Sequence, residues 1–423
     1  IPSEDYKSSL PLTYESAFYE LGQSINENPV FAEELKAAIS ENEEFKRKTE
    51  LLESFCKSGN FSLTPENSSR LFSDSIFLSA SKLETFNSCR FMFFCKYGLN
   101  IKSLQPALFD NMQRGTFVHY CLERLISVYK KKICTMPQSE LDSAVEVFAE
   151  EYLDKIKGYR TVEDAYLKYI KSVLLKSVKF TARFIAADLA QSGFEPVKCE
   201  LKIGGENADI EAVTIHVDNE TNVKITGSVD RVDMYNSYIR IIDYKTGSKV
   251  FKLPDVLVGQ NMQMLVYLYA LIKNSNGKNL PAGIFYLHAK RGIELSELRM
   301  NGLMSDDPEV LQALEEESAG EFIPSKRSRN SFISSDDFDE LFKFIEGKIR
   351  NSGKLIKSGD ISAVPIDGSN GAKNACEYCE FYAICKARDE KHLRAEKLSN
   401  EECMEQIRKE NSQSGNQLYQ VAE

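Results

Sequence analysis

An aspartate and a lysine stand two residues apart at the end of an apolar stretch, in the sequence IIDYKTG at 241–247. On a β-strand, side chains at positions i and i+2 lie on the same face. Asp243 and Lys245 would therefore share the face that Ile239 and Ile241 line. Two charges at the end of a buried face are costly unless a ligand neutralises them.

A second carboxylate can join this pair from the neighbouring strand. The segments GSVDRVD and IIDYKTG are predicted to form a hairpin whose two-residue turn is Asn236-Ser237. This pairing brings Asp230 close to Asp243, and two convergent carboxylates form an oxygen site suited to Mg²⁺ or Mn²⁺. Lys245 could orient or deprotonate an attacking water and offset charge on a phosphoryl oxygen. A surface hairpin with cross-strand ion pairs is the alternative.

Two helical segments carry further polar pairs at a spacing of four residues. His119 and Glu123 lie in RGTFVHYCLE, and Gln263 and Tyr267 lie in QMLVY. Residues four apart share a helix face, so each pair can point toward the carboxylate–lysine strand. Taken singly, each pair is more often structural, because the histidine is alone on its helix and apolar residues surround the glutamine and tyrosine.

Hydrophobic periodicity predicts the elements that must position these residues. Helices are expected at 13–57, 79–99, 110–132, 137–157, 161–192, 255–273 and 336–357, and strands between 195 and 245 and at 281–298. This order of elements predicts an α+β fold with a helical segment in front of it. We expect three parts, at 1–78 (a helical linker or the tail of an upstream domain), 79–390 and 391–423 (a polar tail).

Length and charge restrict the class of protein. The chain has 423 residues and a net charge of −10, which argues against a general polyanion binder but allows a local basic groove. The sequence has no apolar run of membrane length and no signal-peptide pattern, so we expect a cytoplasmic protein without a membrane partner. The chain begins at Ile1 rather than methionine, which indicates a piece of a longer protein.

Three of the ten cysteines have the spacing of a metal centre, and two others are candidates to complete it. Cys376, Cys379 and Cys385 form a C-x₂-C-x₅-C pattern, which indicates a metal or iron–sulfur site. Such sites usually need four ligands, and the candidates for the fourth are Cys89 and Cys95. These two are six residues apart on a predicted helix, so they cannot both face one point.

The ordered set GTFVH, GSVDRVD, IIDYKTG and QMLVY resembles the RecB-type branch of the PD-(D/E)XK nuclease superfamily. The resemblance implies a mixed β-sheet flanked by helices and a metal-dependent nuclease. It implies that His119, Asp230 and Asp243 bind the metal ion (Mg²⁺ or Mn²⁺) and that Lys245 is the catalytic lysine. The residues that it implies in supporting roles are Gln263, Tyr267, Glu200 and Glu123. It also implies that Arg231 and Tyr244 lie beside the ligands or face DNA.

The segment SASKLETFNSCRFMFFCKYGL (79–99) is similar to the first helix of RecB-type nucleases that carry a [4Fe–4S] cluster. This resemblance implies that Cys89 joins Cys376, Cys379 and Cys385 as the cluster ligands. The family usually has proline after that cysteine, whereas this chain has Arg90. A zinc site is the alternative on spacing grounds.

Residues 79 to about 390 are most similar to the C-terminal nuclease region of the AddB family, which forms one half of the bacterial AddAB helicase–nucleases. This implies hydrolysis of single-stranded DNA by one member of a heterodimer with an AddA-type helicase–nuclease, during double-strand break repair by recombination. A GxxxxGK[ST] phosphate loop is absent from the sequence, so no ATPase is expected. The candidate DNA contacts are Lys130–Lys132, Lys249, Lys252, Lys326, Arg327 and Arg329.

Two other functions compete with this one. The chain could be a catalytically silent, cluster-stapled module that binds DNA or serves as a scaffold. It could also be a free-standing RecB-like exonuclease. The joint presence of His119, Asp230, Asp243 and Lys245 argues against the scaffold, which has no need of those residues together.

Overall fold

The structure is a computed structural model. It describes residues 13–56, 62–102, 111–157, 165–289, 297–315, 320–324, 331–367, 375–377, 379–382, 384–385 and 393–420. No helix among them is long and apolar enough to cross a bilayer. The chain divides into two compact units, one formed by residues 1–60 and 382–390 and the other by residues 61–381 and 391–423.

The smaller unit contains three helices, α2 (Tyr14–Glu27), α3 (Pro29–Ile39) and α4 (Glu43–Cys56). The helical content expected over 13–57 is confirmed, but the helix is broken near Asn28. The Asn28 side chain accepts a hydrogen bond from the Phe31 backbone and so caps α3. Proline at 29 has no N–H to continue α2, which ends there.

The larger unit is built on a mixed sheet in the order β1-β4-β5-β6-β7-β8, with β2 and β3 also paired to β4. The β1/β4, β5/β6 and β7/β8 pairs are parallel and the others are antiparallel. The strands are β1 (Ser75–Ser79), β2 (Glu195–Ile203), β3 (Val213–His216), β4 (Asn222–Tyr235), β5 (Tyr238–Lys245), β6 (Leu280–His288), β7 (Asn301–Ser305) and β8 (Phe332–Ile333); β9 (Ile366–Asp367) and β10 (Leu393–Arg394) form a separate parallel pair.

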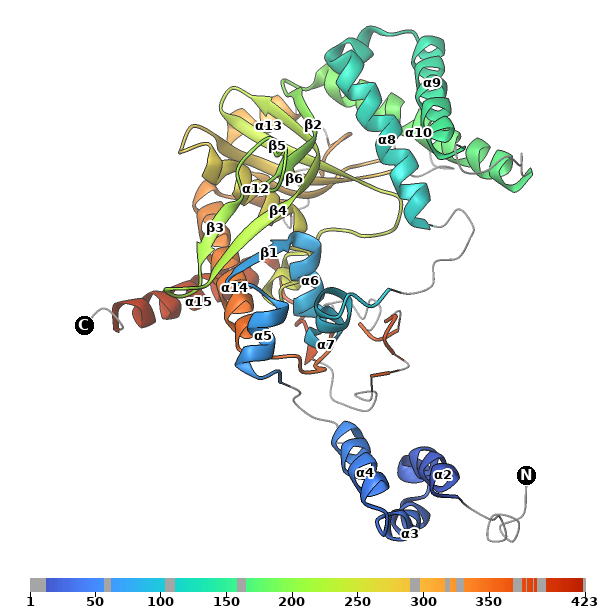
Figure 1. Cartoon of the computed structure of the whole chain (residues 1–423). Helices are drawn as coiled ribbons and strands as arrows, with labels where there is room; N and C mark the ends of the chain where they lie inside the picture. The colour runs from blue at the N-terminus through green and yellow to red at the C-terminus, as the bar shows by residue number, and fades with distance from the viewer. Residues whose placement is uncertain are drawn as a thin grey trace. The chain divides into compact units, whose positions relative to one another are not determined.

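Helices cover both faces of this sheet (Figure 1). One face packs against α8 (Asn111–Tyr129), α10 (Ala165–Gln191) and α13 (Pro308–Leu314), and α9 (Gln138–Lys157) packs on α8 and α10. The other packs against α6 (Ala80–Ser88), α12 (Gln263–Asn274) and α14 (Ser335–Lys357), and α15 (Asn400–Gln420) packs on α14. The remaining helical segments are α5 (Pro65–Leu71), α7 (Arg90–Phe93), the π-helix η1 (Phe94–Gly98), the 3₁₀-helix η2 (Lys130–Thr135) and α11 (Leu253–Leu257). The predicted mixed sheet flanked by helices is confirmed.

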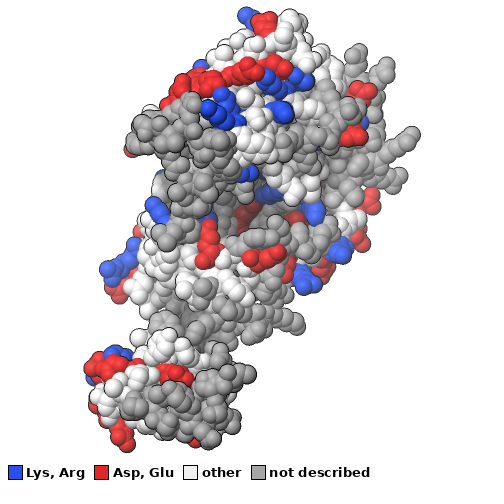
Figure 2. All heavy atoms as spheres, turned by 90° about the vertical axis from the view of Figure 1, so that its right-hand side faces the viewer, with Lys and Arg blue, Asp and Glu red and all other residues white. Residues whose placement is uncertain are grey.

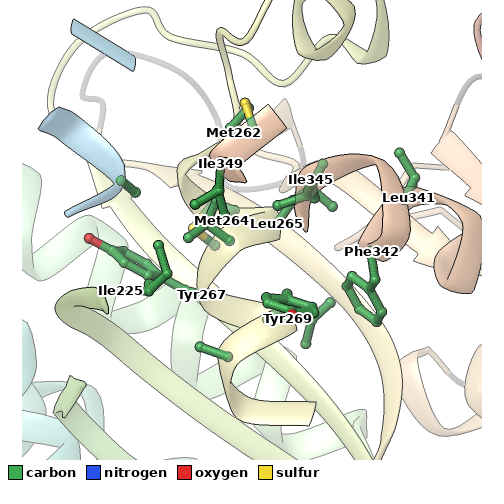
Figure 3. Close-up of a cluster of buried hydrophobic side chains, with 14 of the residues drawn as sticks. Ile225, Met262, Met264, Leu265, Tyr267, Tyr269, Leu341, Phe342, Ile345 and Ile349 are labelled. Carbon is green, nitrogen blue, oxygen red and sulfur yellow. The ribbon is translucent and has the colours of Figure 1, made fainter. Parts of the chain in front are cut away.

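Side chains of β5 alternate between the two cores. Ile239 and Ile241 pack in the core that contains α12 and α14, whereas Ile242 and Tyr244 pack in the core of α8–α10. Figure 3 shows α12 in the first of these cores, with Met264 and Leu265 beside α14. By the same alternation, Asp243 and Lys245 point toward the α12 side where the strand ends.

The structure differs from the expected elements in two helices. The helix expected over 79–99 is interrupted at Cys89, whose backbone is extended with φ −166° and ψ 119°. The helix expected over 255–273 is two helices, α11 and α12. Gly259 and Asn261 separate them with φ values of 78° and 57°, a left-handed conformation that ends a helix.

The ends of the larger unit also differ from expectation. The boundary expected at 79 falls within β1, which starts at Ser75. The C-terminal segment, expected to be a polar tail, forms α15, and its residues Cys403, Met404 and Ile407 are buried in the core. Their spacing gives a narrow apolar stripe that overall polarity hides. Of the strands expected over 281–298, β6 is confirmed and the next strand is β7, while 290–296 lie outside the described residues.

A charged cluster lies inside the larger unit, between β4, β5 and α10. Asp233 accepts two hydrogen bonds from Arg231, at 2.7 and 2.6 Å, and one from Arg240 at 2.9 Å. Arg240 also donates to Asp188 at 2.8 Å. All four side chains are at most 2% exposed. Arg231 is therefore buried, and so is Tyr244, which excludes the expectation that they could face DNA.

Candidate active site

The β4–β5 hairpin brings the two aspartates together as predicted. Its turn is Asn236-Ser237, because Tyr235 pairs with Tyr238. Arg231 is paired with Ile242 farther along the same ladder, so Asp230 and Asp243 are the next residues on the two strands. The ladder ends there, since the Tyr244 N–H donates to the Asp230 side chain, to Oδ2 at 2.8 Å.

Three side chains converge at this point from three elements. His119 comes from α8, and its Nδ1 lies 3.2 Å from Asp230 Oδ2. Glu200 comes from β2, where the pairs Cys199–Arg231 and Leu201–Val229 place it opposite Asp230. His119, Glu200 and Asp230 each offer a ligand atom, and these atoms lie within 4.8 Å of one another. One imidazole and two carboxylates form a donor set that fits a divalent cation such as Mg²⁺ or Mn²⁺.

Glu200 lies in the group of candidate ligands, whereas the sequence predicted only a supporting role for it. Its backbone has φ 48°, a left-handed conformation that costs about 1–3 kcal/mol for a residue with a Cβ and that clusters at functional sites. Ser228 Oγ donates to Glu200 Oε2 at 2.9 Å and orients the carboxylate. A strand pattern contains no sign of this backbone conformation. The resemblance to RecB-type nucleases was the signal that pointed to Glu200, because Glu195, Lys198 and Lys202 are also charged residues of this strand.

Asp243 lies at the side of this group, in contact with Lys245 and Gln263. Its Oδ2 is 2.5 Å from Lys245 Nζ, and its Oδ1 accepts a hydrogen bond from Gln263 Nε2 at 3.3 Å. Asp243 is 6% exposed and Lys245 is 19% exposed. The structure thus brings together Asp243, Lys245 and the α12 residue Gln263, which the sequence predicted to meet.

Burial and the repulsion between carboxylates raise the pKa values of Asp243 and Glu200. Desolvation and the charge of Asp230 raise the pKa of Asp243 to about 6, although Lys245 opposes the shift. Desolvation and Asp230 also raise the pKa of Glu200, against the Ser228 hydrogen bond. Burial lowers the pKa of His119, but its hydrogen bond to Asp230 and the surrounding carboxylates outweigh burial and raise that pKa. A bound cation would relieve the same repulsion.

Asp243→Asn is expected to stabilise the metal-free protein at neutral pH. The folded-state pKa of Asp243 is raised from 3.8 to about 6, so its charged form destabilises the fold above about pH 6. This cost fades as the pH falls from 6 to 3.8. We expect the variant to melt about 2–4 °C above the wild type at pH 7.5 in EDTA, and the difference to vanish near pH 4. A lower melting temperature at pH 7.5 would contradict this account of the site.

Glu200→Gln is expected to weaken binding of Mn²⁺ by at least about tenfold, because an amide is a poorer ligand for a hard cation than a carboxylate. Isothermal titration of the purified chain with Mn²⁺ measures the change. Glu220→Gln is the matched control, since Glu220 is exposed on the turn before β4. Equal affinities in the two variants would remove Glu200 from the ligand set.

Two further side chains complete the surroundings of the site. Tyr267 lies against Gly227, where an added Cβ would be 2.5 Å from its ring and hydroxyl, so β4 needs glycine there. Tyr286, which sequence reasoning missed, is buried with its ring centre 5.1 Å from Lys245 Nζ.

Glu123 lies beside the ligand group rather than in it. It shares α8 with His119, and its Oε1 accepts a hydrogen bond from Ser127 Oγ at 3.3 Å. Its charge contributes to the raised pKa of Glu200, which places the two carboxylates near each other. The geometry therefore places Glu123 beside Glu200, and its supporting role stays a prediction.

The break at Cys89 lies against the segment that leads to the downstream cysteines. Arg90 forms an ion pair with Asp360. The Phe91 N–H donates to the Ser362 carbonyl at 3.2 Å. Arg90, which stands where the family usually has proline, thereby anchors this helix. Cys89 is half-buried.

Two contacts place the Cys376–Cys379 segment in the same region. The Ala375 N–H donates to Asp367 Oδ1 at 3.0 Å, and Lys96 Nζ lies 3.9 Å from Glu380 Oε1. Both cysteines of this segment are half-buried. Cys385 belongs to the smaller unit. Half-buried thiols from two segments held side by side fit a metal or iron–sulfur centre better than a packed core.

The candidate DNA-contacting lysines are partly engaged within the fold. Lys131 lies 3.6 Å from Glu195, and Lys249 donates to Glu84 at 3.1 Å. Figure 2 shows Lys and Arg interspersed with Asp and Glu over the described part of the drawn face, without one dominant basic surface. The run at 326–329 lies outside the described residues.

Comparisons with known proteins show the family of this chain. A family model described as the PD-(D/E)XK nuclease superfamily matches residues 77–386. The B subunit of the ATP-dependent helicase/deoxyribonuclease of Caldanaerobacter subterraneus subsp. tengcongensis is 28% identical over 394 residues, covering 85% of this chain and 34% of that protein. The protein of the same name from Clostridium kluyveri is 31% identical over 361 residues, covering 75% of this chain and 30% of that protein.

This chain spans about a third of the length of these curated relatives. Their names confirm the similarity to the AddB family that the motifs suggested. The family model covers most of the chain and includes every residue of the hairpin site. The chain belongs to the PD-(D/E)XK nuclease superfamily.

Proposed function

We propose that this chain is the nuclease module of an AddB-type helicase–nuclease protein and hydrolyses phosphodiester bonds of single-stranded DNA with Mg²⁺ or Mn²⁺. The observation that carries the proposal is the convergence of His119, Glu200 and Asp230 beside the Asp243–Lys245 pair. A surface hairpin with incidental ion pairs would not bury two carboxylates and raise their pKa values.

His119, Glu200 and Asp230 would hold the cation, with Asp243 as a fourth candidate ligand. A divalent cation held there would act as a Lewis acid toward the scissile phosphate. Ser228 and the Tyr244 N–H orient Glu200 and Asp230 through their hydrogen bonds. Fixing the carboxylates in this way lowers the reorganisation needed when a cation binds.

Lys245 would act on the reacting phosphate. Its ammonium group is held by Asp243, and the Tyr286 ring lies 5.1 Å away. From this position it can donate a proton or a hydrogen bond to a phosphoryl oxygen and stabilise the negative charge that develops there. Gln263 holds the other oxygen of Asp243 and so fixes the direction of the pair.

Cys89, Cys376, Cys379 and Cys385 would hold a [4Fe–4S] cluster with a structural role. The C-x₂-C-x₅-C spacing supports this, as do the contacts that hold the Cys89 helix near residues 360–380. Thiolate ligands from distant parts of the chain would restrain the unfolded state and stabilise the nuclease module.

The relatives' names support a DNA substrate and a partner subunit. Those proteins are named as the B subunits of ATP-dependent helicase/deoxyribonucleases, and such a name implies a second protein in the assembly. We propose that the whole protein pairs with an AddA-type helicase–nuclease and cuts a strand of unwound DNA during break repair. The larger unit would form the nuclease part, and the helices of the smaller unit would lead toward a helicase-like region.

Cleavage of end-labelled DNA tests the proposed activity. Single-stranded DNA, duplex DNA and RNA of one sequence are incubated with the chain in Mg²⁺, in Mn²⁺ and in EDTA. We expect metal-dependent cutting of single-stranded DNA before the other substrates, and release of short products from one end would identify an exonuclease. DNA binding without cutting in any metal would instead support a silent binding module.

A further inference from the structure

We propose that Glu84, on α6, is a positioning residue that fixes the start of α12 and thereby the Gln263 amide that holds Asp243. The inference rests on the proposed nuclease function for its effect on catalysis. The contacts themselves are independent of that function, so they can be tested separately.

Helix α12 begins without a cap of its own. The residue at its N-cap position is Met262, whose side chain makes no capping hydrogen bond to any described residue. The first turn, QMLV, contains no acidic residue that could offset the positive end of the helix dipole. The backbone N–H groups of this turn therefore need an acceptor from elsewhere in the fold.

Glu84 supplies that acceptor from 179 residues earlier in the chain. Its Oε1 accepts a hydrogen bond from the Gln263 N–H at 2.9 Å. Its Oε2 accepts one from Lys249 Nζ at 3.1 Å. One carboxylate thus joins the first residue of α12 to the segment that follows β5. Because both oxygens are engaged within the fold, and Glu84 is outside the group of ligand atoms, we assign it a positioning role.

A second contact joins α6 to the connection between α11 and α12. Asn87, three residues after Glu84, donates from Nδ2 to the Gly259 carbonyl at 3.2 Å. An added Cβ at Gly259 would meet the Asn87 side chain at 2.5 Å, so the two segments are closely packed there. Two side chains one turn apart on α6 therefore hydrogen-bond to the α11–α12 connection and to the first residue of α12.

The contacts made by Glu84 and Asn87 determine where the Gln263 side chain lies. Gln263 is the first residue of α12, and its Nε2 donates to Asp243 Oδ1. The backbone N–H of the same residue is held by Glu84. Loss of the carboxylate would free the first turn to fray and move the amide away from Asp243. A displacement of about 1 Å in such a contact can lower a rate about a hundredfold.

The test is a double-mutant cycle on DNA cleavage. We expect Glu84→Ala to lower kcat about 10- to 100-fold, with the Mn²⁺ affinity of the His119–Glu200–Asp230 group unchanged. Glu84→Gln should recover much of the rate, because its amide oxygen can still accept from Gln263. In a Gln263→Ala background, Glu84→Ala should add little further loss. Fully additive losses would overturn the proposal.

Hydrogen exchange separates this proposal from the proposed function. Peptides that cover residues 262–266 should exchange faster in Glu84→Ala than in the wild type. Glu346→Ala is the matched control, because Glu346 also bonds to α12, at Tyr269 Oη, but far from its first turn. Unchanged exchange in Glu84→Ala would overturn the proposal even if the wild type cuts DNA. Faster exchange in a chain that cuts no DNA would support the contact and count against the nuclease function.

Discussion

Lys245→Met is expected to lower the rate of DNA cleavage by about 10²–10⁴-fold while leaving the affinity for Mn²⁺ within about threefold. The substitution keeps most of the side chain's length and removes the ammonium group that lies 2.5 Å from Asp243. The cation ligands are on other residues, so binding and cleavage should separate. Single-turnover cleavage of single-stranded DNA and a Mn²⁺ titration of the same preparation measure both quantities.

Lys198→Met serves as the control for Lys245→Met. Lys198 lies on β2 as an exposed lysine, paired with Asp209, and should be replaceable with little effect on the rate. If Lys245→Met cuts as fast as Lys198→Met, the lysine takes no part in the reaction. If Lys245→Met loses its Mn²⁺ affinity as well, the substitution has disturbed Asp243 and the ligand group.

Asp233→Asn is expected to lower the free energy of unfolding by about 3–5 kcal/mol. Asp233 neutralises Arg231 and Arg240 in the buried cluster, and none of these side chains has access to water. Burial raises the pKa of Asp233, but the two guanidinium groups outweigh burial and lower it. The amide would leave a buried positive charge unbalanced beside the site. Urea denaturation at pH 7 measures the loss.

The difference in stability between the wild type and Asp233→Asn should depend on pH in a defined direction. Because the folded-state pKa of Asp233 is lowered, its stabilisation is present above the unfolded value of 3.8 and is lost as the pH falls through the folded value. The difference between wild type and variant should therefore shrink in acid. Asp209→Asn, which removes an exposed ion pair with Lys198, should cost less than about 1 kcal/mol. Equal losses in the two variants would contradict the buried network.

The local features of the site were predictable from the sequence. The shared face of Asp243 and Lys245 follows from the two-residue period of a strand. The approach of Asp230 follows from the turn at Asn236-Ser237, which fixes the register of the hairpin. His119 and Gln263 could be assigned to helix faces by spacing. The order of the four motifs supplied the resemblance to RecB-type nucleases and the residue roles that it implies.

The features that could not be predicted depend on contacts between distant segments. Glu200 enters the ligand group through a left-handed backbone that strand periodicity does not encode. Glu84 reaches the site only because α6 packs against the start of α12. The polar residues Asp188 and Arg240 pair only once α10 covers the sheet. Periodicity along the chain carries no information on such pairings.

The central claim is that one cation, held by His119, Glu200 and Asp230, supports cleavage of DNA. Cleavage of single-stranded DNA across a Mn²⁺ titration tests it most directly, with wild type and Asp230→Asn purified side by side. Asparagine can still accept from the Tyr244 N–H through its amide oxygen, so the hairpin should be kept. We predict that the wild type cuts with saturable dependence on Mn²⁺, and that Asp230→Asn neither binds the ion tightly nor cuts. Equal cleavage by both proteins would contradict the assignment of this site.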